Sequence, residues 1–133
     1  MTGTEILLVD DERDILEIGL STLRDAGYLV QPAANGDIAL VLIEQGLTFR
    51  LLITDIVMPG LLDGYALARR AREADPALRI IYSTGFSRVA AIRSPGAPHG
   101  DTLIKPWKPS DLLRLVGTVL QPSATVAKNS RGL

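Results

Sequence analysis

Short apolar runs that alternate with amphipathic segments constrain the fold of this chain more than any other feature. Continuous rather than alternating apolarity is typical of strands that helices cover on both faces. Strand and helix patterns in alternation predict an α/β fold built on a parallel sheet. The five predicted strands are Ile6–Val9, Tyr28–Val30, Leu51–Thr54, Ile80–Ser83 and Leu103–Ile104. Pro32, at the end of the second, places that strand at an edge of the sheet, where proline is tolerated.

Four intervening segments carry apolar residues at helical spacing. They cover residues 15–23, 38–43, 66–75 and 112–120. Gly27, Gly46 and Pro76 predict where the first three helices stop, and Pro109 with Ser110 predicts the start of the last. Residues 88–93 also have helical potential, but several prolines and glycines follow them. We therefore expect a short or distorted helix there, and then a long loop.

Composition narrows the possible functions. The chain of 133 residues has no cysteine and one histidine, which excludes thiolate zinc sites, iron–sulfur clusters and multi-histidine metal sites. A formal net charge of −1 without a basic run argues against nucleic acid as a direct partner. The sequence has neither a signal-peptide pattern nor an apolar run long enough to span a membrane, so we expect a cytoplasmic protein.

Polar residues stand where four of the predicted strands end. Asp10 and Asp11 follow the first strand and Asp55 the third, while Thr84 and Lys105 stand at the ends of the fourth and fifth. Taken singly, each could be a helix cap, a turn residue or a solvated charge. Ligands of such sheets bind at the carboxyl ends of the strands, however, and this set meets there. We therefore expect one site rather than separate caps.

Three carboxylates drawn together repel one another, and a divalent cation relieves that repulsion. Oxygen ligands favour Mg²⁺. Asp55, held at the tip of an interior strand, could then act as a nucleophile towards a phosphoryl group. Lys105 would pair with one phosphoryl oxygen and Thr84 would donate a hydrogen bond to another. The residues thus predict phosphoryl transfer by positioning and charge neutralisation.

In these positions the chain resembles the receiver domains of response regulators in two-component signalling. The residues that carry the resemblance stand in "LLVDDE", "LLITDIVMPG", "YSTG" and "LIKPW", and the match covers about residues 4–121. It implies a receiver domain over residues 1–121, followed by a tail over 122–133 that we expect to be disordered. The implied fold is flavodoxin-like, a doubly wound five-stranded parallel sheet of order 2-1-3-4-5.

The resemblance also implies a role for each site residue. Asp55 matches the phosphoacceptor, which a sensor histidine kinase or a histidine phosphotransferase would charge. Thr84 and Lys105 match the pair that senses the phosphoryl group. The implied ligands of Mg²⁺ are Asp10 (through water), Asp11, Asp55 and the backbone carbonyl of Val57. The peptide bond between Lys105 and Pro106 is expected to be cis.

The implied function is that of a single-domain response regulator. It would not be an enzyme, and its only reactions would be the phosphorylation and dephosphorylation of its own aspartate. It would signal by phosphorylation-dependent docking of an unknown downstream protein, or by phosphorelay. The loop "MPGLLDG" and the motifs "STGFS" and "KPW" are similar to receivers associated with hybrid histidine kinases. Thr102 stands where many receivers carry an aromatic switch residue.

Three other functions are alternatives to this one. An aspartate-dependent phosphohydrolase would need a second aspartate two residues after Asp55, where the chain has Val57. A nucleotide-binding module would need a glycine-rich turn after the first strand, and the chain has "DDERD" there. A receiver that works only as a scaffold, without phosphorylation, stays open.

Overall fold

The computed structural model describes residues 3–85 and 96–121, and its centre is one parallel sheet. The strands lie in the order β2-β1-β3-β4-β5. This is the order that the family resemblance implies. The strands are β1 Ile6–Val9, β2 Val30–Ala33, β3 Leu51–Asp55, β4 Arg79–Gly85 and β5 Asp101–Lys105.

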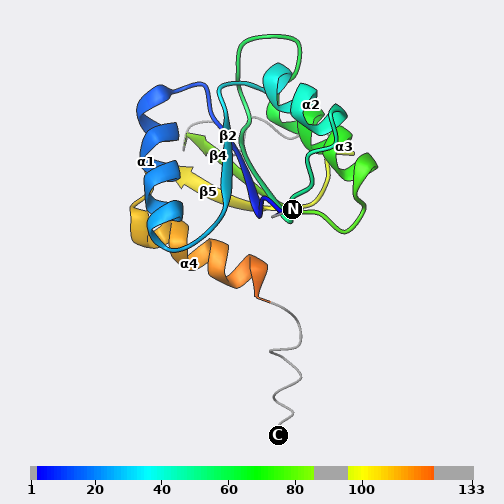
Figure 1. Ribbon diagram of the computed structural model, residues 1–133. Helices are drawn as coiled ribbons and strands as arrows, with labels where there is room; N and C mark the ends of the chain where they lie inside the picture. Colours follow the sequence, from blue (N-terminus) through cyan, green and yellow to red (C-terminus); the bar gives the residue numbers. More distant parts are fainter. Residues whose placement is uncertain (1–2, 86–95, 122–133) are drawn as a thin grey trace, which may run out of the picture.

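Among the described residues, two helices cover each face of the sheet (Figure 1). The helices are α1 Arg13–Asp25, α2 Gly36–Glu44, α3 Gly64–Ala74 and α4 Pro109–Leu120. Helices α1 and α4 pack on one face, and α2 and α3 pack on the other. The predicted three-layer α/β architecture is thus confirmed.

The sheet divides the core into two apolar clusters. In β1, Ile6 and Leu8 belong to the cluster under α1 and α4, while Leu7 and Val9 belong to the cluster under α2 and α3. All four side chains are buried, because successive residues of a strand point to opposite faces and both faces are covered. This explains why the strands are continuously apolar in the sequence.

The second strand begins later than predicted. The sequence indicated Tyr28–Val30, but β2 runs from Val30 to Ala33 and shares only Val30 with that prediction. The backbone N–H of Tyr28 instead donates to the carbonyl of Leu23 and closes the end of α1. Pro32 therefore lies within β2 rather than at its end, and β2 is the edge strand that this proline predicted.

The helix boundaries follow local chemistry. Asn35 and Asp63 cap α2 and α3, each accepting a hydrogen bond of 2.8 Å from the backbone three residues on. Gly27 and Gly46, the predicted stops, follow α1 and α2 with φ values of 98° and 99°. Those values lie in the left-handed region that glycine adopts without steric cost.

Two predictions fall outside the described residues, namely the short helix over residues 88–93 and the tail over 122–133. Within residues 3–85 and 96–121, no helix has both the length and the apolar character to cross a membrane.

Candidate functional site

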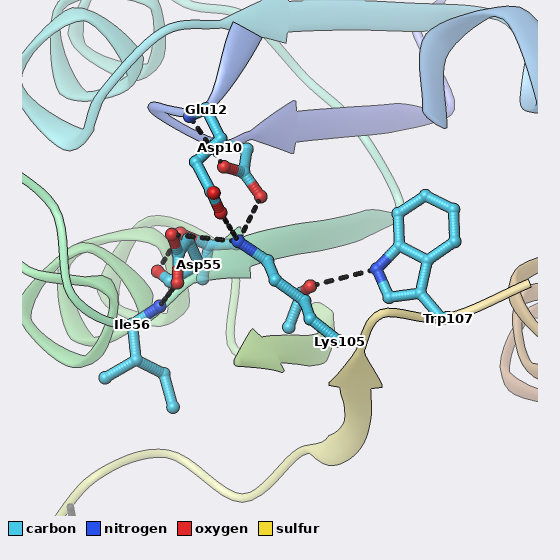
Figure 2. A network of polar contacts seen from close by, with 8 residues as sticks. Asp10, Glu12, Asp55, Ile56, Lys105 and Trp107 are labelled. Carbon is cyan, nitrogen blue, oxygen red and sulfur yellow. Dashed lines mark hydrogen bonds and ion pairs between the residues drawn. The ribbon is translucent and has the colours of Figure 1, made fainter. Parts of the chain in front are cut away.

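One edge of the sheet gathers the polar residues that the sequence singled out. Asp10 directly follows β1, Asp55 ends β3, and Lys105 ends β5. Thr84 is the last residue but one of β4. The strands are parallel and in register, so their carboxyl ends meet at this edge (Figure 2). The structure thus brings the side chains of Asp10, Asp55 and Lys105 together and places Thr84 at the same edge of the sheet.

Lys105 is the centre of the polar network. Its ammonium nitrogen lies 2.7 Å from a carboxylate oxygen of Glu12, 2.9 Å from one of Asp10 and 3.2 Å from one of Asp55. Figure 2 shows the lysine side chain extended between the three acids. One positive charge is therefore shared among three carboxylates, and the cluster keeps a net negative charge.

Asp55 is buried and held at both oxygens. One oxygen accepts a hydrogen bond of 2.8 Å from the backbone N–H of Ile56, and the other contacts Lys105. Burial raises the pKa of Asp55 to about 6. The charge of Lys105 acts in the opposite direction, and Asp10 adds to the rise. The carboxylate is thus fixed in place, and it is more basic than an exposed aspartate.

The neighbours of Asp55 show the same balance of burial against charge. Burial raises the pKa of Asp10, and the hydrogen bonds from the Glu12 backbone and from Lys105 offset only part of the rise. Burial lowers the pKa of Lys105, but its contacts with Glu12, Asp10 and Asp55 outweigh that effect and raise the pKa above its usual value. Lys105 therefore stays charged.

Three of the carboxylates could share a metal ion. Asp10, Asp11 and Asp55 each offer an oxygen, and these oxygens all lie within 4.8 Å of one another. Hard oxygen donors of this kind suit Mg²⁺. Asp11 is exposed while Asp10 and Asp55 are buried, so the cluster lies at the boundary between protein and solvent. An ion bound there would also offset the negative charge that Lys105 leaves uncompensated.

An open cavity of about 570 Å³ lies over this cluster. It is lined by Asp11, Glu12, Ile15, Asp55, Val57, Gly85, Lys105 and Pro106. The peptide bond between Lys105 and Pro106 is cis, as the resemblance implies.

Thr84 carries a polar atom without a partner. Its side chain is 1% exposed, and its hydroxyl oxygen has no hydrogen-bond partner among the residues that the structure describes. A buried hydroxyl group is nearly always hydrogen-bonded, so an unpaired one near the carboxyl end of β4 requires an explanation. A ligand at this edge of the sheet that accepts a hydrogen bond would supply the missing partner.

Three other residues from the sequence analysis have defined environments. Trp107 packs against the core under α1 and α4, and its ring N–H donates to the hydroxyl of Ser83 at 3.2 Å. His99, the one histidine, is exposed. Thr102, at the usual place of the aromatic switch, is also exposed.

The part that Glu12 plays was not predicted from the sequence. Its carboxylate makes the shortest ion-pair contact of Lys105, at 2.7 Å. The available signal was position, because a residue directly after "VDD" starts from the same edge of the sheet as Asp10.

A comparison with protein families matches residues 6–117 to the model of the response regulator receiver domain. The chain belongs to the response regulator receiver domain family. The match covers every described strand and the site residues at their ends.

Two curated relatives show what this receiver is similar to. The response regulator receiver protein CpdR of Brucella abortus is 40% identical over 116 residues, which cover 86% of this chain and 95% of CpdR. The sensor kinase CckA of the same organism is 32% identical over 118 residues, which cover 87% of this chain but only 12% of CckA. The receiver therefore resembles both a protein of its own size and a small part of a kinase. This agrees with the predicted similarity to receivers associated with hybrid kinases.

A solved structure supports the same assignment of the fold. The response regulator TrrA of Thermotoga maritima, in complex with Mg²⁺ and BeF, superposes on this receiver with a TM-score of 0.75. The two share 32% sequence identity over 88% of this chain and 99% of TrrA.

Proposed function

We propose that this receiver accepts a phosphoryl group on Asp55, with Mg²⁺, from a sensor histidine kinase or a histidine phosphotransferase. The observation that carries the proposal is the position of Asp55. It ends an interior strand, contacts Lys105 at 3.2 Å and shares a cluster with Asp10 and Asp11. A nucleophilic carboxylate, a fixed cation and oxygen ligands for a metal are the parts that phosphoryl transfer to an aspartate needs.

The transfer exchanges one bond for another. A carboxylate oxygen of Asp55 forms a bond to phosphorus while the bond between phosphorus and the histidine nitrogen of the donor breaks. The electron pair of the broken bond stays on the imidazole nitrogen. The product is an acyl phosphate whose added oxygens are negatively charged, so it needs donors and positive charge around it.

The chain supplies part of that stabilisation itself. Lys105 would pair with one phosphoryl oxygen. The hydroxyl of Thr84, which has no partner within residues 3–85 and 96–121, would donate a hydrogen bond to another. Asp10, Asp11, Asp55 and the carbonyl of Val57 would hold Mg²⁺, which when bound neutralises charge on the phosphoryl oxygens. Val57 lines the same cavity as Asp55.

The output that we propose is phosphorylation-dependent docking or phosphorelay. The relatives include a receiver protein, CpdR, and a sensor kinase, CckA, which supports a kinase or phosphotransferase as the partner. We expect the reaction in the cytoplasm, and we expect no catalysis beyond phosphorylation and dephosphorylation of the chain itself.

Intact-mass spectrometry after incubation with acetyl phosphate and Mg²⁺ tests the proposal. We expect one added phosphoryl group, no adduct when a chelator replaces Mg²⁺, and none in Asp55→Asn. Asp25→Asn changes an exposed aspartate of α1 in the same way, and it should form the adduct as the natural chain does. An adduct that persists in Asp55→Asn would move the site elsewhere. No adduct in the natural chain would favour the scaffold function.

A further inference from the structure

Glu12 stands at a helix start but does not act as a cap. It is the N-cap residue of α1, and its side chain makes no capping hydrogen bond. Its carboxylate contacts the ammonium group of Lys105 at 2.7 Å instead. The contact is shorter than the distances from Lys105 to Asp10 and to Asp55, which are 2.9 and 3.2 Å. The side chain of Glu12 is thus directed towards the site rather than towards its own helix.

This contact leaves Lys105 fully engaged. A lysine ammonium group has three N–H donors and no acceptor. Three carboxylates already surround it, and its side chain is only 12% exposed. A phosphoryl oxygen on Asp55 can therefore gain a hydrogen bond from Lys105 only if one of the present partners gives its place up.

The three partners differ in how easily they can leave. The Asp10 side chain is 3% exposed and also accepts a hydrogen bond of 2.9 Å from the backbone N–H of Glu12. Asp55 is the group that carries the phosphoryl. Glu12 is 60% exposed, so its carboxylate can return to water at little cost in desolvation. Glu12 is therefore the partner that exchanges most readily.

We propose that Glu12 is a positioning residue for Lys105, and that it gives up its contact with the ammonium group to the incoming phosphoryl group. This inference rests on the proposed function and concerns the regulation of the same site. In the unphosphorylated receiver, Glu12 holds Lys105 at the cavity. On phosphorylation, Glu12 competes with the phosphoryl oxygens for the same donor, so it limits how strongly the site holds an anion.

The inference predicts a gain of affinity when the charge is removed. In Glu12→Gln, a neutral amide replaces the competing carboxylate. The amide oxygen is a weaker acceptor for an ammonium group, so the anion takes that donor of Lys105 more easily. An exposed ion pair is worth a fraction of a kcal/mol to about 1 kcal/mol, which corresponds to about a two- to fivefold change in affinity. A residue that merely supported the fold would give a loss of affinity instead.

The test is a titration of the full chain with beryllofluoride at fixed Mg²⁺, with the bound anion measured by ¹⁹F NMR. We expect Glu12→Gln to bind with a half-saturating concentration about two- to fivefold lower than that of the natural chain. Glu17→Gln makes the same change further along α1, where Glu17 forms an ion pair with Arg13 at 3.6 Å. It should bind like the natural chain. Circular dichroism melting checks that each variant folds.

The outcomes separate this inference from the proposed function. Unchanged or weaker binding by Glu12→Gln would overturn the inference, even where the natural chain binds beryllofluoride and forms the acetyl phosphate adduct. The proposed function would then stand alone. A natural chain that neither binds the anion nor forms the adduct would overturn both.

Discussion

Thr84 and Thr54 are buried threonines on adjacent strands, and their hydroxyl groups differ in hydrogen bonding. The Thr84 hydroxyl has no partner in the described part of the chain, whereas the Thr54 hydroxyl donates to the carbonyl of Asp55 at 2.8 Å. Valine has nearly the same shape as threonine without the polar atom. The same substitution at the two positions should therefore have opposite effects on stability.

We expect Thr84→Val to raise the free energy of unfolding by about 1 kcal/mol, because an unpaired buried hydroxyl group is costly. Thr54→Val should lower it by a similar amount, because a hydrogen bond is lost. Urea denaturation measures both. Thr84→Val should also bind beryllofluoride roughly tenfold more weakly, since the proposed donor is gone. A Thr84→Val chain less stable than the natural one would mean that the hydroxyl already has a partner.

The raised pKa of Asp55 predicts how stability depends on pH. The folded chain holds a proton on Asp55 up to about pH 6, whereas an unfolded chain releases it near 3.8. Between these values the folded state binds more protons, so the free energy of unfolding falls as pH rises from about 4 to about 6. The loss is on the order of 1–3 kcal/mol in the absence of metal.

Asp55→Asn should remove most of this decrease in the free energy of unfolding. The smaller contribution of Asp10 should remain, because the pKa of Asp10 is raised in the same direction. Urea denaturation at pH 4, 5, 6 and 7 with a chelator checks the slope. Asp25 is exposed, so Asp25→Asn should keep the full decrease in the free energy of unfolding over this pH range. Equal slopes in Asp55→Asn and the natural chain would show that burial of Asp55 is not the cause.

Site residues could be predicted from the sequence where the fold determines their position. Asp10, Asp55 and Lys105 could be brought together because each ends a strand of a parallel sheet. The side chain of Glu12 could not be placed, because its direction depends on Lys105, which is 93 residues away in the chain. The difference in hydrogen bonding between the Thr54 and Thr84 hydroxyl groups could not be predicted either. It depends on the positions of other atoms and not on the residue type, which is threonine in both cases.

At the scale of elements, the junction between β3 and α3 sets the position of Asp55. Gly64 begins α3, and its backbone N–H donates to the carbonyl of Ile56 at 2.7 Å. A Cβ atom added to Gly64 would overlap the carbonyl oxygen of Asp55 and lie 2.8 Å from the Cα atom of Ile56. The helix can approach the strand this closely only because the residue is glycine.

Gly64→Ala should therefore lower the free energy of unfolding by about 1–3 kcal/mol and slow formation of the adduct, because the backbone at Asp55 must shift. Gly117→Ala is the matched control, since a Cβ there meets no atom within 4 Å in the described structure. It should raise stability by about 0.5–1 kcal/mol, as alanine favours a helix interior. Urea denaturation separates the two, and equal effects of the two substitutions would contradict the account of this junction.

The strand predictions show which local signals can mislead. Ile6–Val9 was predicted with its observed bounds, because all four residues are apolar and buried. Tyr28 and Leu29 are also apolar, but they lie in the connection between the end of α1 and β2. Their apolarity thus predicted a strand two residues too early. The parallel pairing that corrects this register is a long-range contact that local periodicity does not contain.

At the scale of the whole molecule, the two ends of the sheet are chemically different. The acidic cluster, Lys105 and the cavity over them all lie at the carboxyl ends of the strands. The topology explains this asymmetry, because every connection between strands leaves from that end. The sequence predicted the asymmetry once the strands were known to be parallel.

The most direct test of the central claim is to identify the residue that becomes phosphorylated. The receiver is incubated with acetyl phosphate and Mg²⁺ and then treated with borohydride, which reduces an acyl phosphate of aspartate to homoserine. Peptide mass spectrometry then locates the change. The account predicts homoserine at position 55 alone, and none when a chelator removes Mg²⁺. Reduction at residue 10, 11 or 12, or an unmodified position 55 in a chain that has gained a phosphoryl group, would contradict it.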